Sequence, residues 1–128
     1  MTEHRSANAD QAEFWSTQAG HKWVAHQSAM DQQMQPLLDR ILTRADLHPG
    51  QKVLDIGSGT GVSTIAAAEK VGASGLALGA DISTSMLGHA RKRADGLDNV
   101  EFVHVINQCV VRPILPHQMR AHGLLECL

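Results

Sequence analysis

Apolar and polar residues follow two different periods along this chain, and the period changes near residue 50. Upstream of that point, apolar residues recur every three to four positions, which predicts helices over 9–18 and 21–45. Downstream, over 52–106, short apolar runs alternate with stretches of helical spacing. The pattern therefore predicts a helical N-terminal segment followed by an α/β unit.

Several residues mark the expected boundaries within the N-terminal segment. We expect Gly20 to break the first helix and Pro36 to kink or break the second stretch. Asp31 has the chemistry of a helix N-cap. The composition of 47–50 predicts a turn, and the polar residues 1–8 predict a disordered lead.

The downstream elements alternate regularly between strand and helix. Strands are expected over 52–56, 75–81 and 100–106, with one helix over 62–70 and another from the N-cap Ser83 to Gly96. The residues predicted to face the core from these helices are Val62, Ile65, Ala66, Met86, Leu87, Ala90 and Ala94. Crossovers of the β-α-β type are right-handed, so the order β-α-β-α-β predicts a parallel sheet.

Residues 107–128 lack a convincing period. They could contain a very short strand over 109–112 and a short helix over 116–125. We therefore divide the chain into a disordered lead, a helical segment, a half domain with a parallel sheet and an atypical tail, over 1–8, 9–47, 48–106 and 107–128.

Composition narrows the function classes. Aromatic residues make up only 3% of the 128 residues, which predicts an aliphatic, alanine-rich core. The net charge is −2, with a pI of about 6.4, which gives no electrostatic reason to expect nucleic acid or an anionic membrane as a partner. No apolar run is long enough to span a membrane, so we expect a cytoplasmic protein.

Cysteine and histidine positions do not suggest a metal centre. Cys109 and Cys127 form no C-x-x-C pair, and His117 and His122 lie five residues apart, which suits neither one helix face nor common metal spacing. We expect no metal site.

The most informative stretch is Val53–Gly61, with the sequence VLDIGSGTG. An apolar strand runs into three alternating glycines and then into a helix, a geometry that holds nucleotide-like ligands. No Lys-Ser or Lys-Thr pair follows Gly61, which excludes a P-loop, and the glycine spacing is one residue shorter than a NAD-type fingerprint. Asp81 ends the next strand twenty residues later, where a carboxylate can accept hydrogen bonds from ribose hydroxyls.

These motifs resemble those of class I S-adenosylmethionine-dependent methyltransferases. Val53–Gly61 is similar to their first motif, Ala80–Ser83 with Met86 and Leu87 beyond it to their second, and Asn99–Val103 to their third strand. Trp15, the 20–23 segment and Met30-Asp31 resemble the N-terminal helices of the bacterial branch related to ubiquinone and menaquinone methyltransferases. The likeness covers about residues 9–104.

The resemblance implies a Rossmann-like fold, S-adenosylmethionine as cofactor and methyl transfer to a small-molecule acceptor. It places Gly57, Ser58, Gly59 and Gly61 in the turn under the methionine part of the cofactor. Asp55 would order that turn near the ligand's ammonium group, and Asp81 would bind the ribose hydroxyls. Ile82 and Met86 would line the adenine, although Met86 is equally a candidate core residue. No residue declares itself as catalytic.

The family pattern stops after His104. The acidic residue that the family carries there is missing, and so are the fourth strand and its successors. We interpret the chain as a truncated member, with 105–128 as unrelated sequence; a family-like fourth strand in another frame of the coding DNA would support a frame change. Alternatively, 109–115 could replace the fourth strand.

The missing fourth strand leaves three functions open. The first is methyl transfer, the second a non-catalytic fragment that binds cofactor or another chain, and the third a NAD-linked oxidoreductase. An unpaired strand at 52–56 would also favour self-association.

Overall fold

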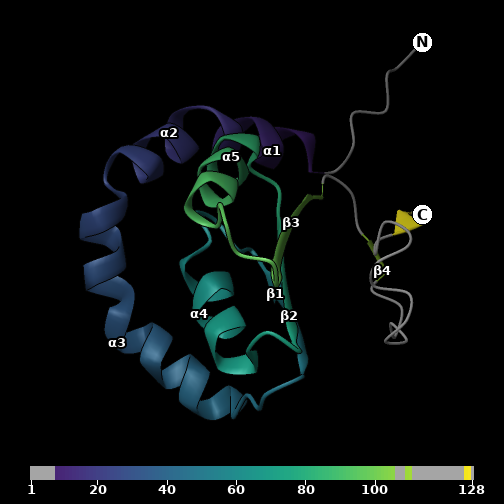
Figure 1. Cartoon of the computed structure of the whole chain (residues 1–128). Helices are drawn as coiled ribbons and strands as arrows, with labels where there is room; N and C mark the ends of the chain where they lie inside the picture. The colour runs from purple at the N-terminus through teal and green to yellow at the C-terminus, as the bar shows by residue number, and fades with distance from the viewer. Residues whose placement is uncertain (1–7, 106–108, 111–125, 128) are drawn as a thin grey trace.

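The computed structural model describes residues 8–105, 109–110 and 126–127. Three helices come first, and a β-α-β-α-β unit follows (Figure 1). The predicted disordered lead and the predicted helix over 116–125 lie outside the described residues, apart from Asn8.

The N-terminal segment consists of α1 (Ala9–Ser16), α2 (Gln18–Ala25) and α3 (Gln27–Ala45). The prediction that Gly20 breaks the first helix is wrong, because the interruption falls at Thr17 and Gly20 lies inside α2. Gly20 serves close packing instead. A Cβ atom there would lie 1.8 Å from the Trp15 carbonyl oxygen and 2.4 Å from Ser85 Oγ.

Asp31 also differs from expectation, and of the two outcomes expected at Pro36 the break does not occur. Asp31 lies inside α3 rather than at its N-cap, and its carboxylate faces Arg93 Nη2 at 3.2 Å. The helix does not break at Pro36, and Figure 1 shows α3 as one continuous, curved helix. Beyond the proline, Leu38 is buried and Leu42 packs against the core, so tertiary contacts hold the helix together across the missing backbone bond.

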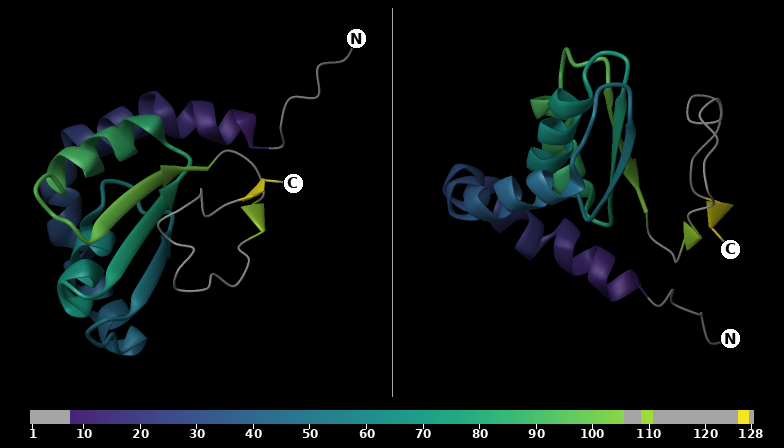
Figure 2. Two further views of the ribbon diagram at one scale, coloured as in Figure 1. Left: turned by 45° about the vertical axis from the view of Figure 1, so that its right-hand side comes forward. Right: turned by 90° about the horizontal axis from the view of Figure 1, so that it is seen from below.

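The α/β unit forms as predicted. It runs through β1 (Lys52–Ile56), α4 (Val62–Val71), β2 (Leu76–Asp81), α5 (Thr84–Arg93) and β3 (Val100–His104). The three strands are parallel in the order β1-β2-β3, and α4 and α5 cover the same face of the sheet (Figures 1 and 2). Because β1 and β2 are parallel, their carboxyl ends lie at the same edge of the sheet. The glycine turn after β1 and the acidic end of β2 therefore meet there.

The core is aliphatic and rich in alanine, as the composition predicts. Ala67 and Ala68 of α4 pack against Ala77 of β2. The α4 face is shifted from the prediction, because the buried positions are Thr64, Ala67, Ala68 and Val71, while Val62, Ile65 and Ala66 are half-buried. The prediction for α5 is confirmed, with the buried residues Met86, Leu87, Ala90 and Ala94.

Among the described strands, β1 pairs only with β2 and is an edge of the sheet. Its last residue, Ile56, is 75% exposed. A separate antiparallel pair joins β4 (Cys109–Val110) to β5 (Glu126–Cys127). The described part of the predicted 109–112 strand therefore pairs with β5 and not with β1, and self-association through β1 stays a prediction. None of the described helices has the length and apolar character needed to cross a bilayer.

Candidate functional site

The glycine turn after β1 depends on backbone angles that other residues rarely adopt. Gly57, Gly59 and Gly61 have φ values of +77°, +55° and +89°. Gly61 is also needed for space, because a Cβ atom there would lie 2.8 Å from the Phe102 ring and 3.0 Å from Ala90 Cβ. The third glycine thus lets α4 and α5 approach β3, while the first two shape the turn.

Backbone bonds attach this turn to the end of β2. The N–H groups of Gly57 and Ser58 donate to the Ala80 carbonyl at 2.7 and 3.1 Å. The Gly59 N–H donates to Asp81 Oδ2 at 2.8 Å. The turn is therefore held against the neighbouring strand and has a fixed position on the sheet edge.

Asp81 connects two elements through its two carboxylate oxygens. While Oδ2 accepts from Gly59, Oδ1 accepts from the Ser83 N–H at 2.8 Å. Ser83 in turn caps α5, its hydroxyl accepting from the Met86 N–H at 3.2 Å. Asp81 thereby fixes the distance between the glycine turn and the start of α5, an organising role that the sequence did not reveal.

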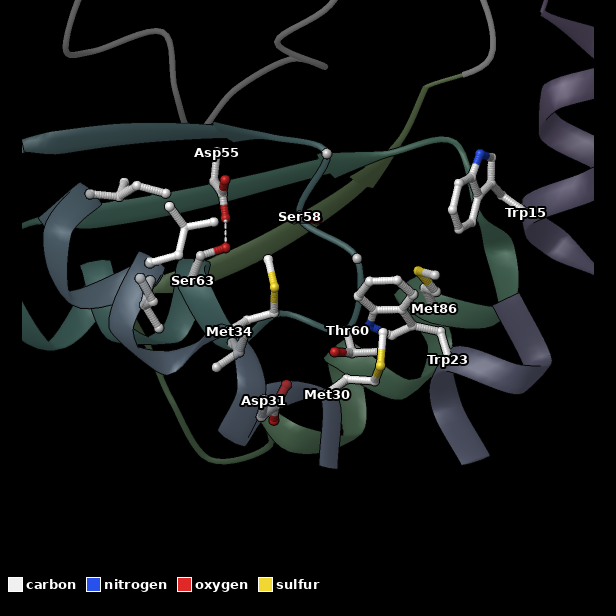
Figure 3. Close-up of a pocket in the computed structure, with 16 residues that line it drawn as sticks. Trp15, Trp23, Met30, Asp31, Met34, Asp55, Ser58, Thr60, Ser63 and Met86 are labelled. Atoms are coloured by element: carbon white, nitrogen blue, oxygen red, sulfur yellow. Dashed lines mark hydrogen bonds between the residues drawn. The ribbon is translucent and has the colours of Figure 1, made fainter. Parts of the chain in front are cut away.

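Asp55 orders the other side of the turn. Its Oδ2 accepts a hydrogen bond from the Ser63 hydroxyl at 2.6 Å (Figure 3). It also accepts one from the Thr64 hydroxyl at 2.7 Å. Both donors lie in the first turn of α4. The carboxylate is half-buried at the end of β1 and places a negative charge beside the N-terminus of α4, where the helix dipole favours it.

Ser58 is the unusual member of the turn. It is only 4% exposed, yet its Oγ has no hydrogen-bond partner among the described residues. Buried polar atoms are almost always paired, because an unpaired one forfeits its hydration. Ser58 is also one of the residues that line a cavity beside the turn, so an unpaired polar group lies next to that cavity.

The cavity has a volume of about 420 Å³ and lies between the glycine turn and the N-terminal helices. Of the predicted cofactor-binding residues, Asp55, Gly57, Ser58, Gly59 and Met86 line it. Met86 is also 4% exposed, so it is a core residue and a wall residue at once.

The other predicted residues lie beside the cavity rather than on its wall. Gly61 packs against Phe102 and Ala90, and Asp81 accepts a hydrogen bond from the Gly59 N–H. The Ile82 carbonyl lies 3.0 Å from His104 Nε2, towards β3. The structure thus brings five of the eight predicted residues to the cavity, and the remaining three are not among the residues that line it.

The opposite wall was not predicted. Trp15 and Trp23 line the cavity and also pack edge to face, with ring centroids 6.4 Å apart. Figure 3 shows Trp23 and Met30 facing the turn across the cavity. The rest of the unpredicted lining consists of Asp31, Met34, Leu37, Leu38, Ile41, Thr60, Val62 and Ser63.

A sequence signal for part of this wall exists in α3. Met34, Leu37 and Ile41 recur at helical spacing and are 43%, 49% and 54% exposed. An apolar helix stripe that the domain core does not bury marks a surface for something else.

The charges of the site restrict its chemistry. Among the described residues that line the cavity, Asp31 and Asp55 are acidic and none is Lys or Arg. No three His, Cys, Asp or Glu side chains come together as a metal site within 8–105. The site therefore suits a ligand with cationic and hydroxyl groups and an apolar neighbour, and it suits a phosphate poorly.

Comparisons with known proteins agree with this geometry. Residues 47–105 match a family model described as a methyltransferase domain. Over 66 residues the chain is 41% identical to demethylmenaquinone methyltransferase from Geobacillus stearothermophilus, which covers 50% of this chain and 28% of that relative. Over 70 residues it is 40% identical to aklanonic acid methyltransferase DauC from Streptomyces sp. (strain C5), with coverages of 53% and 32%.

A solved protein-L-isoaspartate O-methyltransferase has a similar fold. It aligns with a TM-score of 0.51 at 30% identity, over 53% of this chain and 22% of that one. The chain spans less than a third of the length of the two curated relatives, at 28% and 32%.

Proposed function

We propose that this chain, whose residues 47–105 are part of a class I S-adenosylmethionine-dependent methyltransferase domain, binds S-adenosylmethionine at the glycine turn and serves methyl transfer to a small-molecule acceptor. One observation carries the proposal: the buried, unpaired Ser58 hydroxyl in a turn of left-handed glycines, between two ordered carboxylates.

The residues present fit the parts of that cofactor. The backbone of Gly57 and Gly59, which both line the cavity, forms a floor without side chains under the methionine part. The Ser58 hydroxyl can bond its carboxylate, and Asp55 offers a negative charge to its ammonium group. This arrangement offers a hydrogen-bond donor to the carboxylate and a negative charge to the ammonium group.

Asp81 would bind the ribose hydroxyls. Each of its oxygens already accepts one backbone N–H, but an ionised carboxylate has about four acceptor positions. The ribose would therefore add to the existing bonds without breaking them. Ile82 and Met86 are the apolar neighbours proposed for the adenine ring.

When bound, the sulfonium group supplies an activated methyl group, so the protein has mainly to orient the acceptor and exclude water. The α3 wall suits an apolar acceptor through Met30, Met34 and Leu37. A small molecule is favoured over RNA, because the described lining carries no cationic side chain for phosphates. No described residue is assigned as a general base.

Isothermal titration tests the cofactor. S-adenosylmethionine and its demethylated product, S-adenosylhomocysteine, are expected to bind, and NAD is expected not to bind. An Asp81→Asn variant that keeps its circular dichroism spectrum should bind at least about tenfold more weakly. Asp39→Asn is the matched control, because the Asp39 carboxylate is exposed on α3 and, among the described residues, accepts a hydrogen bond only from Gln35 in the same helix.

A ribose analogue distinguishes the proposed contact from general damage to the turn. The wild type should bind 2′-deoxy-S-adenosylhomocysteine more weakly than the parent compound, and Asp81→Asn should lose that discrimination. If NAD binds and S-adenosylhomocysteine does not, the proposal is wrong.

A transfer assay tests the acceptor class. S-adenosylmethionine labelled at the methyl group is offered with a low-molecular-mass extract, with total tRNA or with total protein. Label is expected in the small-molecule fraction, and label in RNA or protein would overturn the acceptor assignment. Cofactor binding without transfer to any fraction would favour the non-catalytic alternative.

A further inference from the structure

Arg93, in the last turn of α5, joins three separate parts of the site. Its Nη1 donates to the Thr60 carbonyl at 3.1 Å and lies 3.3 Å from Thr60 Oγ1. Its Nη2 lies 3.2 Å from Asp31 Oδ2 on α3. The Arg93 guanidinium therefore links the glycine turn to α3, and Arg93 itself belongs to α5.

This contact is partly shielded from water. The side chains of Arg93 and Asp31 are 24% and 19% exposed, and Thr60 is 2% exposed. Exposed ion pairs contribute little, but a charged donor that reaches a buried carbonyl forms a stronger bond than a neutral one. The planar fork of arginine suits two directions at once, which a lysine cannot reproduce.

A second contact holds the same carboxylate. Gln27 Nε2 donates to Asp31 Oδ2 at 2.5 Å, and Gln27 Oε1 lies 2.7 Å from His89 Nε2 of α5. Residues of α5 thus meet α3 at two points, through Arg93 and through His89. The position of Asp31 relative to α5 is set from both.

The turn is the part that most needs such support. Thr60 lies between Gly59 and Gly61, two residues with positive φ and little intrinsic restraint. Asp31 and Thr60 both line the cavity, on the α3 wall and the turn wall respectively (Figure 3). Arg93 therefore bridges the two walls from outside the cavity.

We propose that Arg93 is a positioning residue that holds the glycine turn and α3 at the separation that the cofactor requires. Only the part of this proposal that concerns the cofactor rests on the proposed function. The mechanical part, that Arg93 restrains the turn and α3 together, concerns the protein alone and can be measured without ligand.

Amide hydrogen exchange tests the mechanical part. In Arg93→Met, the Gly59 and Gly61 amides, which donate to Asp81 Oδ2 and to the Ser58 carbonyl, should exchange about tenfold faster. Arg91→Met is the matched control, because Arg91 is on the same helix but donates to the Phe102 carbonyl, at 3.2 Å. Unchanged exchange at the turn in Arg93→Met, or an equal change in Arg91→Met, would overturn the proposal.

Titration with S-adenosylhomocysteine tests the cofactor part. Arg93→Met and Asp31→Asn should each bind about tenfold more weakly, and the double variant about as weakly as Arg93→Met alone. The affinity of Arg93→Lys should fall between those of the wild type and Arg93→Met, because lysine restores the charge beside Asp31 but not the planar fork of arginine. Affinity losses that simply add would show independent roles and refute the bridge.

The two failures are distinguishable. A wild type that does not bind S-adenosylhomocysteine contradicts the proposed function, while the exchange data still decide whether Arg93 restrains the turn. A wild type that binds, with Arg93→Met binding equally well, contradicts the positioning role and leaves the proposed function intact.

Discussion

Ser58 and Ser83 give a matched pair of substitutions with opposite expected effects. Both are buried hydroxyls, 4% and 0% exposed, and both change by the same single atom in Ser→Ala. They differ in partners: Ser58 Oγ has none in the described part of the chain, whereas Ser83 Oγ donates to the Trp15 carbonyl at 2.6 Å and accepts from the Met86 N–H. The comparison isolates the cost of an unpaired hydroxyl.

The expected sizes follow from these contacts. An unsatisfied buried hydroxyl costs about 1–3 kcal/mol, and Ser58→Ala keeps the Cβ that lies over Gly79, so the free energy of unfolding should rise by about 1 kcal/mol. The midpoint temperature of thermal unfolding should rise by about 4 °C. Ser83→Ala loses a helix cap and a second hydrogen bond, and it should cost roughly 2–3 kcal/mol.

Urea denaturation without ligand measures both changes, and titration with S-adenosylhomocysteine measures affinity. Ser58→Ala should bind about tenfold more weakly, because a hydrogen bond to a charged ligand group is worth about 1.5–3 kcal/mol. A Ser58→Ala protein that is destabilised as strongly as Ser83→Ala would refute the unpaired hydroxyl. A stabilised variant with unchanged affinity would refute its contact with the cofactor.

Two further predictions concern glycines. Gly61→Ala should lower the free energy of unfolding, measured by urea denaturation, by roughly 3 kcal/mol, because it combines a left-handed backbone with overlap on Phe102 and Ala90. Gly57→Ala has open space around the added Cβ and should lower it by only about 1–2 kcal/mol, so equal costs would refute the packing role of Gly61. Gly20→Ala should detach α1 and α2 from the start of α5 and shift the fluorescence of the two tryptophans to longer wavelength. Gly88→Ala, inside α5 with nothing within 4 Å of the added Cβ, should stabilise the protein by about 0.5–1 kcal/mol and leave the tryptophan emission unchanged.

The parallel sheet and the turn-facing residues could be predicted because their signals are local. A change of apolar period marks strands directly, and three alternating glycines followed by a helix have few other uses. The Ser83 cap was likewise predictable, since it depends only on its immediate neighbours.

The remaining features depend on contacts between distant residues, which a one-dimensional pattern does not contain. The sequence around Gly20 predicts a helix break, because its need for space comes from Trp15, Ser83 and Ser85, which fold against it. The sequence around Asp31 predicts a cap, because its partner, Arg93, lies sixty-two residues away. The α3 wall was missed because helical spacing shows that a helix is amphipathic but not which neighbour its apolar side meets.

The bond between Ser83 and the Trp15 carbonyl also bears on the order in which the chain assembles. The first helices leave the ribosome long before residue 83, so they cannot reach their final contacts until β2 and the start of α5 have been made. Until then the apolar side chains of Trp15 and Trp23 lack that attachment site. The helical segment is therefore synthesised before the residues that anchor it, and pausing during synthesis would prolong the exposure of its tryptophans.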